Sequence, residues 1–270
     1  MTPNPSASSS NPSSSKRLRR FFYSESLKDH LPGELLRLSP AESRHMMKTI
    51  RLKLGDYCLL ADGKGYEYMA MIHEESPAGV VLKIEKKISS HEQEKDFSET
   101  GLQLKLFVGC PQRGKMDFII EKLQELGVSE LVPLMTSFSM MRYESKDIPK
   151  VVGRWTRIAQ EALKQSGSGK LLKIHEPVKF QKVVEEVKEH EFHVLFHPDA
   201  FSTAWNEFKK QKDGYFQQGK KVHIWIGPEG GFSDPEVETL RQKKAHVVHL
   251  GKTLLKVDTA CMVAVALSRF

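Results

Sequence analysis

The feature that most constrains the fold is a pair of apolar runs near the C-terminus, each of which stops at glycine before a helical pattern begins. Val222–Ile226 has the length of a strand and ends at Gly227–Gly231, a Gly-Pro-Glu-Gly-Gly sequence that cannot continue a strand. His246–Leu250 is the second run and ends at Gly251. Ligands of parallel sheets bind beyond the carboxyl ends of the strands, so both loops are expected to offer bare backbone to a ligand. The alternative is that Gly227–Gly231 is only a tight turn.

A third strand end joins these two further up the chain. Phe192–Phe196 is an apolar run, and His197-Pro198 follows it. A histidine before proline is usually only a turn residue, so this loop is a weaker candidate by itself. Its place beside two glycine-rich strand ends makes it a third expected ligand loop.

Strand and helix patterns alternate from residue 102 to the end. Ser233 and Glu236 form a capping-box pattern that opens a helix to about Lys244, and a last helix begins at Asp258 or Thr259. Such alternation predicts an α/β fold with a parallel sheet covered on both faces. The other expected strands are Leu104–Cys110 and Glu130–Leu134, and the other expected helices are Gly114–Leu126, Ile148–Gln165, Phe180–Glu189 and Thr203–Gln211.

Residues 17–90 have a different character and predict a small, mostly β domain. A capping-box pattern at Ser39–Glu42, with proline at the first helical position, opens a helix to about Ile50. Asp62–Gly65 is a hairpin turn between two strand patterns. The expected strands are Tyr57–Ala61, Tyr66–His73 and Val80–Ile84. The polar stretch that follows predicts a linker over 91–101 and a second domain over 102–270.

Residues 1–16 consist mainly of Ser, Pro and Asn and predict a disordered arm without the apolar core of a secretory signal. The arm is free of acidic residues and precedes Arg17, Arg19 and Arg20, so a transit peptide remains an alternative to a flexible extension that touches RNA. The net charge of +7 favours a polyanionic partner such as nucleic acid, although a modest basic excess also suits an ordinary protein surface. No apolar run is long enough to span a membrane.

The motifs also exclude several kinds of site. Gly227–Gly231 is neither a dinucleotide fingerprint nor a phosphate-binding loop, which disfavours a nucleotide-dependent oxidoreductase. Cys58, Cys110 and Cys261 are far apart and odd in number, which fits a reducing cytoplasm and no disulfide framework. The histidines show no metal-ligand spacing, so we expect no metal.

Several motifs, in order along residues 17–270, resemble the ribosomal small-subunit methyltransferase E family of the SPOUT superfamily. The most specific is Ile226–Ser233, Ile-Gly-Pro-Glu-Gly-Gly-Phe-Ser. The others are Gly114–Asp117, Glu121-Lys122, Glu125–Val128, the segment Glu161–Gly167, and Leu250-Gly251. In the N-terminal domain the resemblance rests on Arg19–Phe22, the His45–Arg51 helix and Asp62-Gly63.

The resemblance implies a PUA-like β-barrel that binds RNA, followed by a SPOUT-type parallel sheet with a deep trefoil knot. It implies a homodimer that transfers a methyl group from S-adenosylmethionine (SAM) to N3 of a uridine in 16S ribosomal RNA, free or within the small subunit. Strand-end backbone would bind the adenine edge of SAM, and apolar residues such as Phe196, Leu250 and Leu255 would wall the pocket. The expected cofactor-binding residues are Phe196, His197, Pro198, Ile226, Gly227, Glu229, Gly230, Gly231, Leu250, Gly251, Leu255 and Thr259.

Methylation at uridine N3 requires a base that removes the N3 proton or a nearby cation that stabilises the anion as it forms. We expect Lys256 and Asp258 to be catalytic, although Lys256 could be a solvated surface residue and Asp258 a simple helix N-cap. Glu229 is expected to hold its loop rather than to react. The expected RNA-binding residues are Arg19, Arg20, Arg51, Lys115 and Lys170.

The chain departs from the family pattern at three positions. Lys256, Asp258 and Ser168 stand where the family usually has Arg, Glu and Arg. Lysine keeps the charge of arginine but loses its two-pronged hydrogen bonding. The alternative function is therefore a catalytically weakened RNA-binding assembly factor of the same fold.

Overall fold

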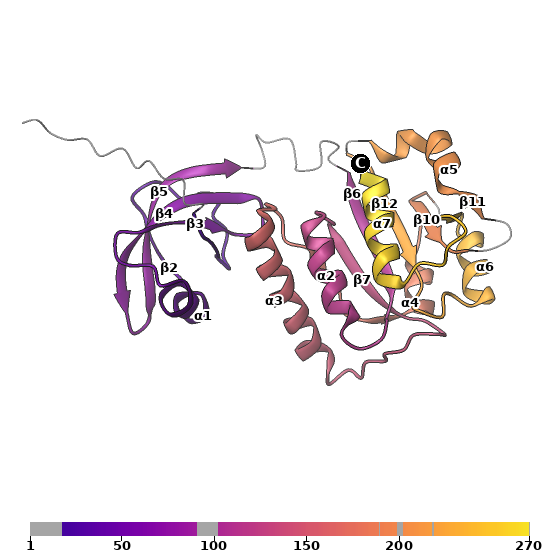
Figure 1. Ribbon diagram of the computed structural model, residues 1–270, viewed down its shortest axis with the longest axis horizontal. Coiled ribbons are helices and arrows are strands. Elements are labelled where there is room, and N and C mark those ends of the chain that lie inside the picture. The colour runs from indigo at the N-terminus through magenta and orange to yellow at the C-terminus, as the bar shows by residue number, and fades with distance from the viewer. Residues whose placement is uncertain (1–17, 91–101, 189, 199–201, 218, 270) are drawn as a thin grey trace, which may run out of the picture.

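The computed structural model describes residues 18–90, 102–188, 190–198, 202–217 and 219–269. The expected arm over 1–16 and linker over 91–101 lie outside these residues. The described chain forms two sheets, each with its own buried apolar side chains (Figure 1). None of the described helices is long and apolar enough to cross a membrane.

The smaller sheet has five strands in the order β1-β3-β4-β5-β2. All neighbouring strands in it are antiparallel except β1 and β3, which are parallel. The expected strand Tyr57–Ala61 is confirmed, and the two after it are longer than expected because they pair with each other over most of their length. The bounds are β1 Arg20–Phe22, β2 Leu35–Arg37, β3 Tyr57–Ala61, β4 Tyr66–Ser76 and β5 Gly79–Ser90.

The helix of the smaller unit begins and ends where the sequence predicts. It consists of α1 (Pro40–Arg44) and a π-helical turn η1 (His45–Ile50). The Ser39 hydroxyl accepts a hydrogen bond from Glu42 N at 3.3 Å, which caps the first turn. The Glu42 carboxylate does not complete the expected capping box, because it binds Phe22 N and Lys164 Nζ instead.

The larger sheet has eight strands, all of them parallel, which confirms the expected α/β class. Its order is β11-β13-β10-β12-β6-β7-β8, with β9 also paired to β7. The bounds are β6 Gln103–Gly109, β7 Glu130–Met135, β8 Lys173–Ile174, β9 Val178–Lys179, β10 Phe192–Phe196, β11 Thr203–Ala204, β12 Lys221–Ile226 and β13 His246–His249.

Helices cover both faces of this sheet, as expected. Side chains along β12 alternate between two buried clusters: Ile224 belongs to one and Trp225 to the other. The Ile224 face is covered by α2 (Lys115–Glu125), α3 (Ile148–Ser166), α5 (Trp205–Lys212), the 3₁₀ turn η2 (Asp213–Phe216) and α7 (Val257–Arg269). The Trp225 face is covered by α4 (Phe180–Glu186) and α6 (Asp234–Gln242).

Two helix starts differ from expectation. The helix expected from Thr203 begins at Trp205, because Thr203 and Ala204 pair with β13 as the edge strand β11. The last helix begins at Val257, one residue before the expected range. Asp258 is therefore not an N-cap but lies in the first turn, where its negative charge suits the helix dipole.

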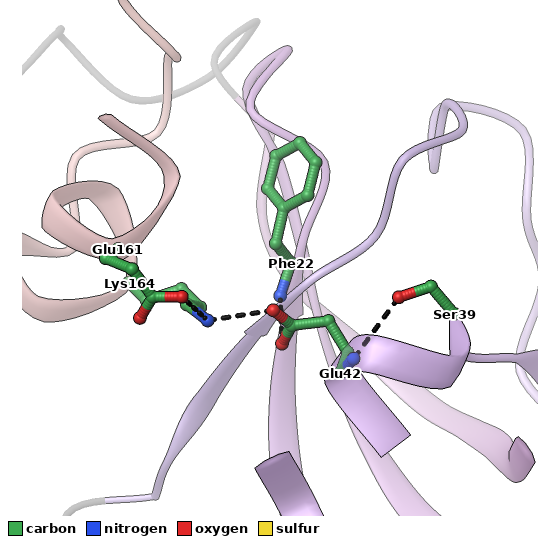
Figure 2. Close-up of polar contacts among 5 residues, drawn as sticks. All are labelled: Phe22, Ser39, Glu42, Glu161 and Lys164. Atoms are coloured by element: carbon green, nitrogen blue, oxygen red, sulfur yellow. Dashed lines mark hydrogen bonds and ion pairs between the residues drawn. The ribbon is translucent and has the colours of Figure 1, made fainter. Parts of the chain in front are cut away.

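The smaller sheet is docked on α3 through buried polar contacts (Figures 1 and 2). Lys164 Nζ, near the end of α3, donates to Glu42 Oε1 at 2.8 Å and to Glu161 Oε1 at 2.7 Å. Arg20 donates to the carbonyl oxygen of Lys164 at 3.1 Å. A further backbone hydrogen bond runs from Leu171 N to Gly63 O at 2.8 Å.

Candidate functional site

The three loops predicted to bind a ligand follow neighbouring strands of one sheet. β10 lies between β12 and β13, and Phe196 is in register with Ile226 on one side and Val248 on the other. His197 N continues the ladder by donating to Val248 O at 2.9 Å. Because the strands are parallel, all three loops leave the sheet at the same edge. The expectation that they lie together is confirmed.

A crevice is expected between β10 and β12 because the chain leaves these strands toward opposite faces. The helix after β10 is α5, on the Ile224 face, and the helix after β12 is α6, on the Trp225 face. Adjacent parallel strands whose connections diverge in this way form the switch point at which open α/β sheets bind ligands. The segment 250–256 then joins β13 to α7, which packs against α2 and β12.

The Gly227–Gly231 loop is folded tightly on itself. Gly231 has φ +73° and donates its N–H to Pro228 O at 2.9 Å. A Cβ on Gly227 would lie 2.7 Å from the carbonyl carbon of Gly231, so a side chain there would displace the backbone. A Cβ on Gly231 would lie 3.6 Å from the His197 ring. The His197 ring therefore lies directly against Gly231, and the two loops adjoin each other.

Gly230 is in a different environment. A Cβ at this position would lie 2.9 Å from Cβ of Phe138, which follows β7 and is half exposed. The loop is thus packed against the segment after β7 on its Gly230 side. The side chain of a Gly230→Trp variant would therefore displace Phe138 before it could reach the expected ligand site.

Glu229 holds its loop, as expected. Its carboxylate accepts hydrogen bonds from Gln112 N at 3.1 Å and Lys115 Nζ at 2.8 Å. Burial acts to raise the pKa of Glu229, but these hydrogen bonds outweigh it, and the pKa is lowered. The loop is therefore tied to the start of α2 by a carboxylate that stays ionised at neutral pH.

Lys115 was expected to contact RNA, but in this structure it is paired within the protein. The hydrogen bond to Glu229 raises the pKa of Lys115, and the nearby carboxylate of Asp258 adds to this effect. Lys115 is thus hydrogen-bonded to Glu229 and lies within electrostatic range of Asp258, so the three residues form a cluster of interacting charges. The sequence did not reveal this cluster, because its members are separated by up to 143 positions, from 115 to 258.

The remaining residues of the expected site lie in the loop before α7 and in the first turn of that helix. Gly251 has φ +118°, and a Cβ there would meet no atom within 4 Å. Lys256 is exposed. Its carbonyl oxygen accepts a hydrogen bond from Ala260 N at 2.8 Å, which is the first main-chain hydrogen bond of α7. Leu255 and Thr259 are half-buried.

The expected RNA-binding residues differ in their surroundings. Arg20 forms an ion pair with Glu67, its side chain is 14% exposed, and it also donates to Lys164 O, so it serves the junction between the two units. Lys170 lies in the same junction, where it forms a backbone bridge with Lys64. Arg19 and Arg51 are exposed on the smaller unit.

One group of side chains has the proximity that a metal site needs. Glu191, His193 and His223 place ligand atoms within 4.8 Å of one another. Register brings the two histidines together across β10 and β12, which spacing along the chain could not show. However, Trp225 Nε1 donates to His193 Nδ1 at 3.2 Å. This puts the proton of the neutral ring on Nε2, the nitrogen that faces Glu191, so His193 is not arranged as a ligand.

Comparison with known proteins identifies the family of this chain. A family model described as an RNA methyltransferase domain matches residues 98–269. The ribosomal RNA small subunit methyltransferase E of Bacillus subtilis is 24% identical over 259 residues, covering 92% of this chain and 95% of that protein. The protein of the same name from Aquifex aeolicus is 28% identical over 249 residues, covering 91% and 97%.

A solved structure agrees over both units. The putative methyltransferase Lpg2936 from Legionella pneumophila, in complex with the bound cofactor SAM, superposes with a TM-score of 0.81 at 27% identity. The match covers 93% of this chain and 97% of that one. Because the family model covers most of the larger sheet and its helices, the chain belongs to the RNA methyltransferase domain family.

Proposed function

We propose that the protein transfers the methyl group of SAM to N3 of a uridine in the 16S ribosomal RNA of the small subunit. The observation that carries this proposal is the edge of the sheet at which the three strand-end loops leave the neighbouring strands β10, β12 and β13. It lies within the part of the chain that matches the RNA methyltransferase model. The relatives named ribosomal RNA small subunit methyltransferase E supply the substrate class.

The residues present suit SAM. Backbone groups at 196–198, 226–231 and 250–251 can hydrogen-bond an adenine edge, and Gly231 and Gly251 adopt conformations that side chains rarely allow. Leu250 and Leu255 provide partly buried apolar surface beside these groups. Bound there, SAM would supply an electrophilic methyl group on its sulfonium.

The protein must handle the proton on uridine N3. Asp258 is the carboxylate in the first turn of α7, within electrostatic range of Lys115, and we assign it as the base that accepts the proton. Lys256 is exposed one residue before that helix, and we assign it to the negative charge that develops on the uracil ring. Glu229 and Lys115 neutralise each other and position the loop.

The wider assembly extends the same proposal. We assign residues 17–90 to a PUA-like RNA-binding domain and residues 102–270 to a knotted SPOUT domain that acts as a homodimer in the cytoplasm. The knot is supported by the resemblance of Ile226–Ser233 and Leu250-Gly251 to the family motifs. Arg19 and Arg51 are exposed and suited to RNA backbone, whereas Arg20 and Lys170 act first at the junction.

Two measurements test the proposal. Titration calorimetry of the purified protein with SAM should show binding, and heat that is absent from a correctly folded sample would refute it. Mass spectrometry of ribosomal RNA from a deletion strain should show the loss of one N3-methylated uridine. An unchanged modification profile, with SAM binding intact, would favour the weakened assembly factor, to which the lysine at 256 and the serine at 168 point.

A further inference from the structure

A pocket of about 630 Å³ lies between the starts of α2 and α3, beside the crevice but distinct from it. Its walls come from the turn before α2, the segment 141–143 after β7, and the first turns of α3. This volume lies within the range of small-ligand sites, about 300–1,000 Å³. None of the residues expected to bind SAM lines it.

The pocket is strongly basic. Five cationic and two acidic side chains line it, and one of the acidic ones, Asp117, is paired with Arg154. Among the described residues, Arg113, Lys150 and Arg157 form no ion pair. Cations that converge on a cavity without internal partners are suited to a polyanion, and RNA phosphates are the polyanion this family meets.

The same pocket also offers an aromatic ring and a hydrogen-bond acceptor. Tyr143 lines it, supported edge-on by the buried Trp155 at 5.6 Å between ring centroids. Burial raises the pKa of Tyr143 to about 12, so its hydroxyl stays protonated and can donate. Asp117 Oδ1 is buried and has no hydrogen-bond partner among the described residues. A carboxylate oxygen in this state can accept from an N–H or O–H of a ligand.

Hydrogen bonds connect the wall of the pocket to the Gly227–Gly231 loop. Gln112 lines the pocket, and its backbone N–H holds Glu229 of the Gly227–Gly231 loop. Lys115, one residue beyond Gly114 of the pocket wall, holds the same carboxylate. An RNA strand with one nucleotide at the crevice would therefore have a neighbouring nucleotide within reach of the pocket.

We infer that this pocket binds a nucleotide that flanks the methylated uridine, with its phosphate on Arg113, Lys150 and Arg157 and its base against Tyr143. Asp117 Oδ1 accepts a hydrogen bond from the base or from the ribose hydroxyl. The inference rests on the proposed function and adds a second contact point to it. It makes RNA affinity depend on α2 and α3 as well as on the smaller sheet.

The experiment compares Arg113→Ala/Arg157→Ala with the wild type. In vitro transcribed small-subunit ribosomal RNA is the probe, and binding is followed by filter retention across a range of salt concentrations. We expect affinity to fall about tenfold or more, and the slope of log affinity against log salt to become shallower by about 1. The SAM affinity measured by calorimetry should stay unchanged. Lys182→Ala/Lys188→Ala is the matched control, because these exposed lysines lie at α4, on the opposite face of the sheet.

Lys150→Glu provides an independent variant at an exposed position that does not touch the buried Trp155 core. It should weaken RNA binding more than Lys150→Ala does, because it adds repulsion. If both pocket variants bind RNA with wild-type affinity and salt slope, the pocket is not an RNA site, and the proposed function still stands. If the wild type itself neither binds nor methylates this RNA, the proposed function fails with it.

Discussion

Lys164 is the residue whose replacement should most clearly reveal how the two units are held together. Its side chain is 6% exposed and donates to Glu42, which is 16% exposed, and to Glu161, which is 58% exposed (Figure 2). Lys164→Met keeps most of the volume but, among the described residues, leaves the Glu42 carboxylate with only the hydrogen bond from Phe22 N at 3.3 Å.

Breaking a buried ion pair by removing one partner costs about 3–5 kcal/mol. The cost here should lie near the lower end, about 3 kcal/mol, because Glu161 can turn toward water when the lysine is removed. Urea unfolding followed by circular dichroism would measure it. Adding Glu42→Gln to Lys164→Met should recover part of the loss, because it removes the unpaired buried charge.

Lys146→Met is the matched control, since Lys146 pairs with Glu144 on the surface, with exposures of 76% and 73%. That change should alter the free energy of unfolding by less than about 0.5 kcal/mol. If Lys164→Met is equally harmless, or if the double variant is no better than the single one, the buried pair does not stabilise the junction. Burial acts to lower the pKa of Lys164, but the hydrogen bonds that its ammonium donates to Glu161 and Glu42 outweigh this, and the pKa is raised. Its contribution should therefore persist at neutral pH and be lost only as the pH rises through that raised pKa.

Three further predictions concern the crevice and the core. Gly231→Val forces a β-branched residue to φ +73° beside His197, so calorimetry should show SAM affinity at least tenfold lower, and stability should fall by about 1–2 kcal/mol. Glu229 has a lowered pKa, so its contribution to stability is present above the unfolded pKa and lost as pH falls through the folded one. The stability gap between wild type and Glu229→Gln should therefore close on acidification, and a gap independent of pH would contradict the role of the carboxylate. Burial raises the pKa of Cys58 and Cys110 to about 12 and that of Cys261 still further, so Ellman's reagent should label none of them until the protein unfolds.

Long patterned elements could be predicted from the sequence, whereas short ones could not. The strands Tyr57–Ala61 and Phe192–Phe196 have the bounds that their apolar runs predict. The capping box at Ser233 is confirmed by the hydrogen bond of Ser233 N to Glu236 at 2.9 Å. The two-residue strands β8, β9 and β11 were missed, since so few residues carry no periodicity and form only by pairing with a neighbour.

Glu42 shows why a correct local pattern can still mislead. Its spacing from Ser39 predicts a capping box, and the Ser39 half of that box is present. The carboxylate instead reaches Phe22 N and Lys164, 122 positions away, because a buried ammonium binds a carboxylate more strongly than the main-chain amide of the exposed Ser39 does. Lys164 is too far from Glu42 along the chain for a local sequence pattern to reveal this competing interaction.

The candidate site, too, could be predicted from the sequence only in part. The glycines at 227, 230, 231 and 251 and the apolar strands before two of the loops were sufficient to predict a ligand site at strand ends, since only backbone conformation and strand length were involved. The packing of distant segments decided the rest: it made β10 and β12 neighbours, brought Asp258 within electrostatic range of Lys115, and formed a basic pocket between α2 and α3. Backbone conformation depends on neighbouring residues, whereas contacts between distant segments depend on how sheets and helices pack, which the tertiary structure alone determines.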